Sequence, residues 1–421
     1  MVKKFQSIKG FYDVGPERQR LWRFFENEVL KVLDQYSFEE IGLPIVESTG
    51  LFIEGVGTHT DIVEKEMYSW EDKLNKDRLT LRPEGTAGCV RAVIENSLTY
   101  NGPIKLFYRG PMFRHENVQK GRQRQFHQLG VETFGIESSD ADAEQIILLS
   151  RLFKKLGLSN ISLELNTIGD SEDRNLYKDS LIKYFEGRKS VLDEDSLRRL
   201  YENPLRILDS KNPAMQTLLN DAPKLVNYIS DEARTHFDSL CQTLELNKID
   251  YVLNHRLVRG LDYYNRTVFE FVTNDLGSQG TVAGGGRYDY LIQNLGGSHT
   301  HACGFAIGIE RIILLLEVNT LPQSKFNPDV YIVNLGSKAR VLAFSIAEEL
   351  RDLDVNTSLN IEGSSFKSQM KKADKSGAKI ALIIGDNEVE TNEIQIKFLR
   401  KDLPQATISY NEASLYIKEN L

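Results

Sequence analysis

The sequence predicts an α+β protein in which a helical segment interrupts a large mixed domain and a smaller α/β domain follows. Three observations predict this organisation. Helix-periodic and strand-like segments are mixed as far as residue 170 and resume after residue 253, charge-rich helical sequence fills the interval 171–253, and a regular β-α-β-α-β pattern begins after residue 328. A chain of 421 residues is also long enough for two or three domains, since a domain usually takes about 100–200 residues.

The first part of the chain opens with a predicted amphipathic helix, Glu17 to Tyr36, in which apolar residues recur at helical spacing after Pro16. A second helix, Ala141 to Leu156, is predicted to end at Gly157. Strands are predicted where short β-prone runs lie between turn-forming residues. They cover Glu40–Val46, Arg78–Arg82, Ile104–Arg109, Phe126–Phe134 and Ile161–Asn166.

The later parts of the chain change texture twice. Between Ser171 and Leu253 the helical sequence is broken at Pro204, Pro213 and Pro223, which indicates an insertion of several short helices. A strand at Val268–Val272 and an apolar helix at Gly304–Leu316, after a short strand, return to the mixed pattern. The last domain is predicted to contain strands Val330–Asn334, Ser358–Ile361 and Ile380–Ile384 and helices Ala339–Leu350 and Phe366–Ser376. The predicted boundaries are therefore 1–170 and 254–320 for the mixed core, 171–253 for the insertion, 319–328 for a linker and 329–421 for the final domain.

Composition excludes several classes of protein. Apolar residues make up 41% of the chain and charged residues 27%, which is typical of a folded globular protein and not of a disordered one. No apolar run approaches the roughly 20 residues that cross a bilayer. Cys89, Cys241 and Cys303 lie far apart, which argues against a disulfide framework or a zinc knuckle. We therefore expect a cytoplasmic protein with no membrane partner, and a net charge of −8 does not exclude a local basic surface for nucleic acid.

Two predicted strands flank a loop rich in arginine and glutamine. Arg114 begins this loop and Phe126 follows it. A guanidinium makes forked contacts to phosphate oxygens, and an aromatic ring stacks on a base, so the pair suits a nucleotide site that lacks a phosphate-binding glycine loop. The alternative is an exposed hairpin with solvated charges.

The strand after the loop strengthens the nucleotide hypothesis. Phe126, Gln128, Gly130 and Glu132 share one strand face, because side chains alternate with period two. An amide and a carboxylate on one face are poor core residues unless they find partners, and a bound ligand is a natural partner.

Three further stretches carry charged or glycine-rich sequence. Leu81–Thr86 places a carboxylate and a hydroxyl at a strand end, with a helix cap by Thr86 as the alternative. Leu257–Tyr264 carries an arginine and two tyrosines, and Ala283–Asp289 contains three glycines that permit close approach of the backbone to a ligand. Arg311 lies in an apolar helix and is expected to face a phosphate or a carboxylate, with an ion pair to Glu310 or another acid as the structural alternative.

Taken in order, these stretches resemble the signatures of class II aminoacyl-tRNA synthetases, and within them the histidyl-tRNA synthetase family. Ile41–Pro44 resembles the first signature, a strand that ends in proline at a dimer interface. Phe113–Glu116 with the strand through Phe126 resembles the second, and Gly308–Arg311 the third. Arg259–Tyr264 and Gly284–Asp289 are similar to two blocks peculiar to the histidine enzymes. The likeness runs from Gly10 through the final domain.

The resemblance implies an antiparallel catalytic sheet flanked by helices, a helical insertion over the tRNA acceptor arm and a C-terminal α/β anticodon-binding domain. It also implies a homodimer that attaches L-histidine to the 3′-terminal adenosine of tRNA(His) through a histidyl-adenylate. ATP is the implied second substrate, and Mg²⁺ is expected with it, although no protein metal ligand is predicted.

The resemblance also implies roles for individual residues. Arg259 resembles the family's catalytic arginine, and Arg114 is expected to hold the ATP α-phosphate and the histidine carboxylate. The implied ATP contacts are Arg114, Glu116, Arg122, Phe126 and Arg311. The implied histidine contacts are Glu84, Gly85, Thr86, Arg114, Gln128, Glu132, Arg259, Tyr263, Tyr264 and Tyr288.

A basic helix face in the final domain is the predicted tRNA surface. Lys367, Lys371 and Lys375 recur every four residues, and Lys379 lies just beyond Gly377. The alternative is an ordinary solvated face. The resemblance to an anticodon-binding domain favours contacts to tRNA phosphates, which are sensitive to salt.

Three alternative functions remain to be weighed. A noncatalytic paralogue, such as a synthetase-like regulatory subunit of histidine biosynthesis, is expected to lack the final domain and part of the set Arg114, Arg259 and Arg311. A class II enzyme for proline, threonine or glycine does not account for the block Arg259–Tyr264. A purely RNA-binding module leaves the ATP constellation unexplained.

Overall fold

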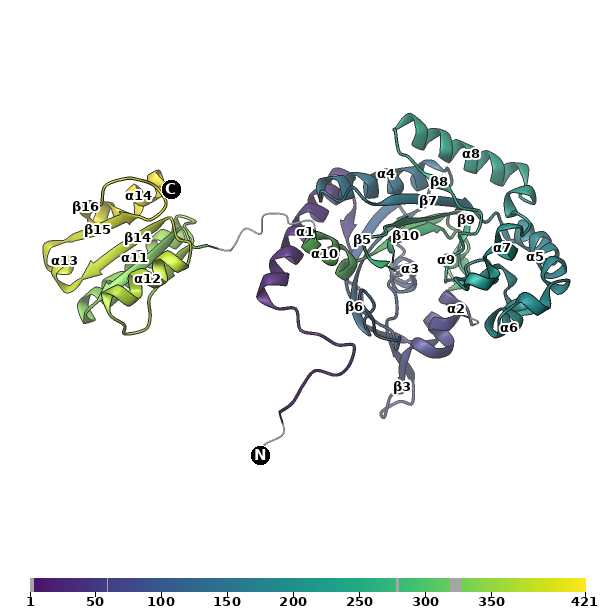
Figure 1. Ribbon diagram of the computed structural model, residues 1–421, viewed down its shortest axis with the longest axis horizontal. Coiled ribbons are helices and arrows are strands. Elements are labelled where there is room, and N and C mark those ends of the chain that lie inside the picture. The colour runs from purple at the N-terminus through teal and green to yellow at the C-terminus, as the bar shows by residue number, and fades with distance from the viewer. Residues whose placement is uncertain (1–3, 59, 278–279, 319–326) are drawn as a thin grey trace. The chain divides into compact units, whose positions relative to one another are not determined.

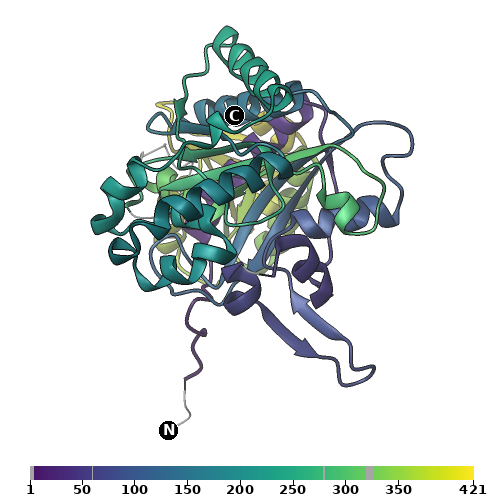
Figure 2. The same ribbon diagram turned by 90° about the vertical axis from the view of Figure 1, so that its right-hand side faces the viewer.

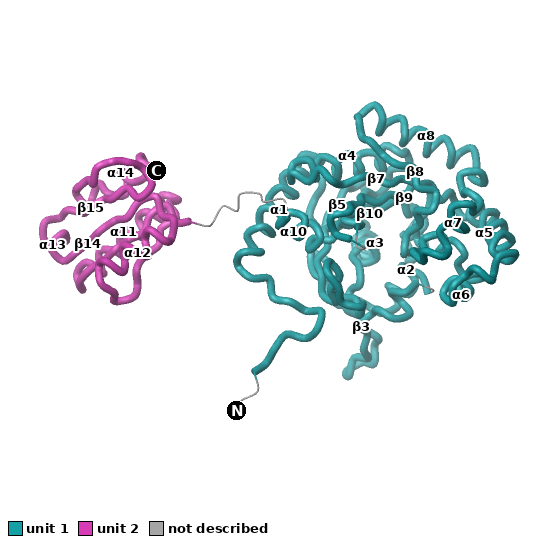
Figure 3. Tube along the Cα trace, in the orientation of Figure 1, with its two compact units in different colours: residues 1–321 teal, residues 322–421 magenta. Residues whose placement is uncertain are grey.

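An eight-stranded sheet forms the centre of the larger part of the molecule (Figure 1). The computed structural model describes residues 4–58, 60–277, 280–318 and 327–421. They belong to two compact units, Met1–Leu321 and Pro322–Leu421 (Figure 3). The strands of the large sheet, in spatial order, are β1 (Glu39–Glu40), β5 (Ile104–Phe113), β6 (Gln125–Phe134), β11 (Ala302–Gly308), β10 (Thr281–Arg287), β9 (Asn265–Val272), β7 (Ser162–Thr167) and β8 (Val252–Leu253).

The pairing within this sheet confirms the expected antiparallel core. Every neighbouring pair from β5 to β7 is antiparallel, and only the two edge pairs, β1 with β5 and β7 with β8, are parallel. The central strands β6, β11 and β10 are long and bonded on both sides, so side chains that they present are held in fixed positions.

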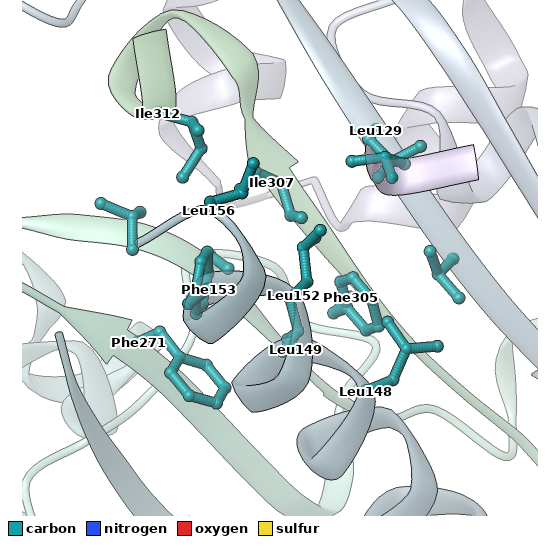
Figure 4. Packing of buried hydrophobic residues seen from close by; sticks show 14 of the residues in the cluster. Leu129, Leu148, Leu149, Leu152, Phe153, Leu156, Phe271, Phe305, Ile307 and Ile312 are labelled. Atoms are coloured by element: carbon teal, nitrogen blue, oxygen red, sulfur yellow. The ribbon is translucent and has the colours of Figure 1, made fainter. Parts of the chain in front are cut away.

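One face of the sheet carries the main hydrophobic core. Leu129 and Val131 of β6 and Phe305 and Ile307 of β11 point to this face and pack against helices (Figure 4). The helices that supply the other side of the core are α1 (Pro16–Gln35), α4 (Asp140–Lys155), α8 (Asp231–Leu246) and α10 (Ile309–Val318). Because side chains alternate along a strand, the residues that alternate with these on β6 and on β11 must point to the opposite face.

The opposite face packs against the helices between Ser171 and Asn220, which follow β7. These helices lie on the right in Figure 1 and face the viewer in Figure 2. Tyr177, Leu181 and Phe185 of the segment share one core cluster with Tyr108 and Met112 of β5. The segment is therefore joined to the sheet by a common core. The helices that belong to this side are α3 (Thr86–Glu95), α5 (Ser171–Glu186), α6 (Glu194–Glu202), α7 (Gln216–Asn220) and α9 (Leu291–Asn294).

A small three-stranded sheet and one helix complete the first unit. The strand order is β2 (Val46–Ser48), β4 (Arg78–Leu81), β3 (Tyr68–Glu71), all antiparallel. Helix α2 (Thr49–Val56) follows β2 directly. Since β4 leads through Glu84 into α3, the small sheet places the carboxylate of Glu84 beside the large sheet.

The second unit is a five-stranded sheet with helices. The strand order is β13 (Thr357–Leu359), β12 (Val330–Leu335), β14 (Ile380–Gly385), β15 (Glu393–Phe398), β16 (Ala406–Ser409). The first three strands are parallel and the last two are antiparallel to their neighbours. Its helices are α11 (Ser337–Asp352), α12 (Phe366–Lys375), α13 (Asp386–Thr391) and α14 (Tyr410–Asn420).

The predicted β-α-β-α-β pattern of this unit is confirmed, and the chain adds α13, β15, β16 and α14 beyond it. Most of the predicted linker 319–328 lies outside the described residues.

Three predicted elements differ from the structure. The strand predicted at Glu40–Val46 is wrong, because the chain leaves β5 after Ile41 and pairs again only at Val46, which lies opposite Leu81. Gly304–Gly308 is strand and not helix, since these glycine- and alanine-rich residues pair with both β6 and β10. The last two residues of the predicted insertion, Val252–Leu253, belong to the large sheet as β8.

None of the helices in the described ranges is both long enough and apolar enough to span a bilayer.

The core predicts a specific stability difference. Leu152 of α4 is 1% exposed and packs among the residues of Figure 4, so Leu152→Ala is expected to lower the free energy of unfolding by about 3 kcal/mol. Leu246 at the end of α8 is 76% exposed, and Leu246→Ala is expected to cost less than about 0.5 kcal/mol. Urea unfolding followed by tryptophan fluorescence measures this, since Trp22 and Trp70 both lie in the first unit. Equal losses in the two variants would contradict this packing.

Candidate active site

A polar cavity opens on the face of the sheet opposite the main core. It is lined by the predicted residues Glu84, Thr86, Arg114, Glu116, Arg122, Phe126, Gln128, Arg259, Tyr263, Tyr264, Tyr288 and Arg311. Gly85 and Glu132 lie directly beside it, in contact with residues of the lining. Segments more than 200 residues apart in the sequence therefore meet in one place.

The hairpin of β5 and β6 supplies one end of the cavity. Arg114 follows the last residue of β5, and its guanidinium carbon lies 5.1 Å from the centre of the Phe126 ring. Its Nε donates to the carbonyl of Pro83 at 2.8 Å, which fixes the arm of the side chain. Arg122 forms an ion pair with Glu116 at 2.5 Å. This end presents a ring face bordered by two guanidinium groups.

Arg311 enters the same end of the cavity from the start of α10. Its Nε donates to the carbonyl of Gly121 at 3.1 Å, and a terminal nitrogen donates to the carbonyl of Thr281. Glu310, one of the acids predicted as an alternative partner of Arg311, accepts hydrogen bonds from the backbone N–H of His127 at 2.9 Å. Burial lowers the pKa of Arg311, and the neighbouring Arg122 lowers it further. A site that crowds cations in this way favours an anion.

Glu132 occupies the other end, beneath the cavity floor. The carboxyl group is 1% exposed and accepts from three hydroxyls: Thr86 at 2.9 Å, Tyr108 at 3.0 Å and Tyr288 at 2.5 Å. Burial raises the pKa of Glu132 to about 8, although the hydroxyl donors oppose the shift. The sequence predicted a ligand as the partner of Glu132, but the protein itself supplies three hydrogen-bond donors to this carboxyl group.

Close packing around Glu132 explains several glycines. A Cβ on Gly304 would lie 1.6 Å from a carboxylate oxygen of Glu132. Tyr108 lies between Gly85 and Gly130, where an added Cβ would come within 2.1 Å of its ring. Gly85 therefore makes room for a ring that holds Glu132 and does not itself line the cavity.

The N-cap residue of α3 is Gly85, and the side chain of Glu84 before it accepts from the first N–H groups of the helix. The Glu84 carboxylate accepts from the backbone N–H groups of Thr86 at 2.7 Å and Ala87 at 2.8 Å. The predicted alternative role of Thr86 as cap is wrong, because its hydroxyl is committed to Glu132. Burial raises the pKa of Glu84, and these backbone bonds oppose the increase. Glu84 thus presents a fixed acidic group to the cavity.

Arg259 is a further lining residue of the cavity. It forms an ion pair with Glu270 of β9 and lies 5.8 Å from the centre of the Tyr264 ring. A Cβ on Gly284 would lie 2.6 Å from the Arg259 guanidinium, so the glycine-rich strand makes room for this arginine. Burial on its own lowers the pKa of Arg259, but Glu270 and Tyr264 outweigh it and raise the pKa.

Several residues of the cavity were not foreseen from sequence. Glu270 lines the cavity and accepts from the Thr281 hydroxyl at 2.8 Å. The sequence signal for Glu270 was a single acidic residue inside the apolar strand Val268–Val272. Arg206 reaches the cavity from the helical segment and pairs with Asp61 at 3.4 Å. No local pattern in the sequence links Arg206 to Asp61, which lies 145 residues earlier.

The predicted basic face of the second unit is present. Lys367, Lys371 and Lys375 are exposed on α12, and Lys379 lies beyond the helix, where it pairs with Asp329 at 2.8 Å.

Comparison with known proteins identifies the family. A model of the histidyl-tRNA synthetase family matches residues 10–312, and a model of an anticodon binding domain matches residues 329–420. The chain belongs to the histidyl-tRNA synthetase family. It is therefore an aminoacyl-tRNA synthetase, and the arginines, tyrosines and Glu132 described above lie inside the matched region.

Relatives of this family match along nearly the whole chain. The histidine–tRNA ligase of Methylobacillus flagellatus is 61% identical over 98% of this chain and 99% of the relative. The histidine–tRNA ligase of Ralstonia nicotianae is 53% identical over 95% of this chain and 94% of the relative. The crystal structure of apo S. aureus histidyl-tRNA synthetase is 34% identical, covers 99% of this chain and 100% of that chain, and has a TM-score of 0.83.

The burial of Glu132 predicts a specific dependence of stability on pH. Because its pKa rises from 4.5 unfolded to about 8 folded, the folded state holds a proton in this range that the unfolded state has lost. Stability should therefore fall as pH increases between these values, with a slope of up to about 1.4 kcal/mol per pH unit.

Urea unfolding of wild type and Glu132→Gln from pH 5 to 9 measures this dependence, with exposed Glu54→Gln as the control. The wild type should lose stability relative to Glu132→Gln as pH rises toward 8. Parallel profiles would show that Glu132 titrates alike in both states.

Proposed function

We propose that this chain activates L-histidine with ATP to form histidyl-adenylate and pyrophosphate, and then transfers the histidyl group to the 3′-terminal adenosine of tRNA(His). The names of its relatives and its family membership support this proposal. One observation carries it: a single cavity joins a cluster of arginines beside an aromatic ring to a buried carboxyl group surrounded by hydroxyls.

The arginine-rich end suits ATP. Phe126 offers a ring face for adenine, and Glu116 can accept from the adenine amino group. Arg114, Arg122 and Arg311 surround this end and can bind phosphate oxygens as forked donors.

The buried end suits histidine. A carboxyl at Glu132 and a phenol at Tyr264 can satisfy both ring nitrogens of an imidazole, with Tyr263 and Tyr288 closing the pocket. One hydrogen bond can join Glu132 to a ring nitrogen, whether its proton belongs to the carboxyl group or to the ring. A substrate side chain without such nitrogens would leave Glu132 without this hydrogen bond. Sites of this kind reject analogues strongly. Glu84, Thr86 and Gln128 are positioned along the cavity to hold the α-amine.

The chemistry requires stabilisation of charge rather than a general base. The histidine carboxylate is already ionised when it attacks the α-phosphorus, and negative charge then grows on the nonbridging oxygens. Arg114 and Arg259 both line the cavity, and fixed cations aimed at developing charge lower the barrier by several kcal/mol. Their permanent charge suits this role.

Magnesium is proposed to enter with ATP. The described residues contain no cluster of three or more His, Cys, Asp or Glu side chains that could hold a metal, and the cavity acids Glu116 and Glu270 both face arginines. When bound, the ion would neutralise phosphate charge.

Contacts to tRNA are proposed for both units. Residues 329–421 match an anticodon binding domain, and Lys367, Lys371 and Lys375 lie exposed there. The helical insertion 171–253 is proposed to cover the acceptor arm. A cytoplasmic homodimer is also proposed, and the exposed side chains of Ile45 and Val46 beside Ile41–Pro44 are consistent with an interface there.

The alternative is a noncatalytic synthetase-like regulatory or RNA-binding paralogue. The ligase is favoured because Arg114, Arg259 and Arg311 all line one cavity and because the chain carries the second domain.

ATP–pyrophosphate exchange with each of the twenty amino acids, on purified protein with magnesium and without tRNA, tests the proposed function. Exchange with histidine alone is expected, because only its ring satisfies Glu132 and Tyr264 together. Exchange with a different amino acid would overturn the assignment of the pocket. Absence of exchange by folded protein would favour the noncatalytic paralogue.

Glu132→Ala is expected to reduce histidine-dependent exchange by about two orders of magnitude or more, because the imidazole loses its buried partner. Binding of a nonhydrolysable ATP analogue, measured by calorimetry, should stay within about twofold of wild type because the ATP end is unchanged. Wild-type kinetics for histidine in this variant would rule out Glu132 as the ring contact.

A further inference from the structure

Arg287 is a fully buried arginine just outside the cavity. Its side chain is 0% exposed, and it lies at the end of β10, immediately before Tyr288. It donates five hydrogen bonds, to the carboxylate of Asp142 at 3.1 and 2.5 Å, to Asp289 at 3.2 Å, and to the carbonyls of Ile136 at 3.1 Å and Ser138 at 2.8 Å. Every acceptor lies in protein, so Arg287 has a structural position and no direct access to substrate.

These contacts join the two chain segments that carry the histidine pocket. Tyr288 follows Arg287 directly, while Ile136 and Ser138 follow β6, the strand that carries Glu132. In the sheet, β11 lies between β6 and β10, so no ladder hydrogen bonds connect the strand of Glu132 to the strand of Tyr288. Arg287 makes the direct connection at the end of both strands.

The sheet holds the backbone of Tyr288 on one side only, where its N–H donates to the carbonyl of Ala302 in β11 at 2.7 Å. On the other side, pairing between β10 and β9 is regular from Ala283 to Gly286, which lies opposite Val268, and then shifts so that Arg287 lies opposite Asn265. After this irregularity, side-chain hydrogen bonds replace the pairing of β10 with β9: Asn265 donates to Asp289 at 3.0 Å, and Arg287 donates to Asp289. A hydroxyl that must meet a carboxyl at 2.5 Å depends on such fixing.

We propose that Arg287 is a positioning residue for histidine recognition, which sets the distance and direction of the Tyr288 hydroxyl relative to the Glu132 carboxyl. The inference rests on the proposed assignment of Glu132 and Tyr288 to the histidine ring.

The charge of Arg287 suits this function. Burial alone lowers its pKa, but Asp142 and Asp289 outweigh burial and raise the pKa, so the group stays charged. A buried charge must keep its partners. A lysine at this position keeps the charge but has no planar fork, and so cannot reach Asp142, Asp289 and the two carbonyls together.

Steady-state ATP–pyrophosphate exchange on the full chain tests the proposal, with Arg287→Lys, Tyr288→Phe and the double variant. Each single variant is expected to raise the KM for histidine about tenfold and to leave the KM for ATP within about twofold. Because Arg287 acts through Tyr288, the double variant should be no worse than Tyr288→Phe alone.

Two further variants keep the result interpretable. Asp142→Asn removes the ionic partner of Arg287 and keeps its volume, so it should also raise the KM for histidine. It tests the positioning role even if Arg287→Lys does not fold. Arg256→Lys is the matched control, because Arg256 also clamps several groups, including the carbonyl of Leu208 and the side chains of Gln216 and Asn220, but does not line the cavity. Its KM for histidine should stay within about twofold of wild type.

The outcomes separate the two hypotheses. If Tyr288→Phe raises the KM for histidine while Arg287→Lys and Asp142→Asn do not, the positioning role is overturned and the pocket assignment stands. If the effects of Arg287→Lys and Tyr288→Phe multiply, or if Arg256→Lys changes the KM equally, Arg287 contributes only general stability. A normal KM for histidine in Tyr288→Phe overturns the positioning role together with the assignment of Tyr288.

Discussion

The buried carboxyl group of Glu132 is the constraint around which the buried end of the cavity is arranged. A carboxyl group removed from water must be protonated or supplied with donors, and here three hydroxyls from α3, β5 and the end of β10 converge on it. The ring of Tyr108 in turn requires glycines at Gly85 and Gly130, and the carboxyl group itself requires one at Gly304, because any side chain there would occupy the same space. The proposed recognition of the imidazole and the local packing are therefore determined by the same few atoms.

The alternation of strand side chains separates stability from chemistry. On β6, Leu129 and Val131 complete the core beneath the helices, while Gln128 before them and Glu132 after them belong to the cavity side. A shift of the strand by one residue would exchange these two sets. Long antiparallel neighbours on both sides prevent that shift, so the core that stabilises the unit also holds the side chains of the cavity in place.

The arginines of the cavity are held by protein acceptors before any substrate is bound. Arg259 pairs with Glu270, Arg122 pairs with Glu116, and Arg114 donates to a backbone carbonyl. These contacts place each guanidinium where phosphate oxygens are proposed to bind, so little reorganisation is needed when charge develops. The helical segment contributes Arg206 and Asp61 lies opposite it, which brings that segment to the edge of the same cavity.

Local periodicity and residue types such as Arg114, Phe126 and Arg259 were enough to predict the class of fold, many of its helices and strands, and the order of the motifs. The tertiary structure alone decided which groups meet. It placed Gly304–Gly308 in a strand, because pairing with β6 and β10 outweighs the apolar helical pattern. It also assigned Glu270 to Arg259, Glu84 to the start of α3 and Arg287 to the segment after β6. These partners lie on different strands and loops, and their proximity arises only when the sheet is assembled, so no local pattern could reveal them.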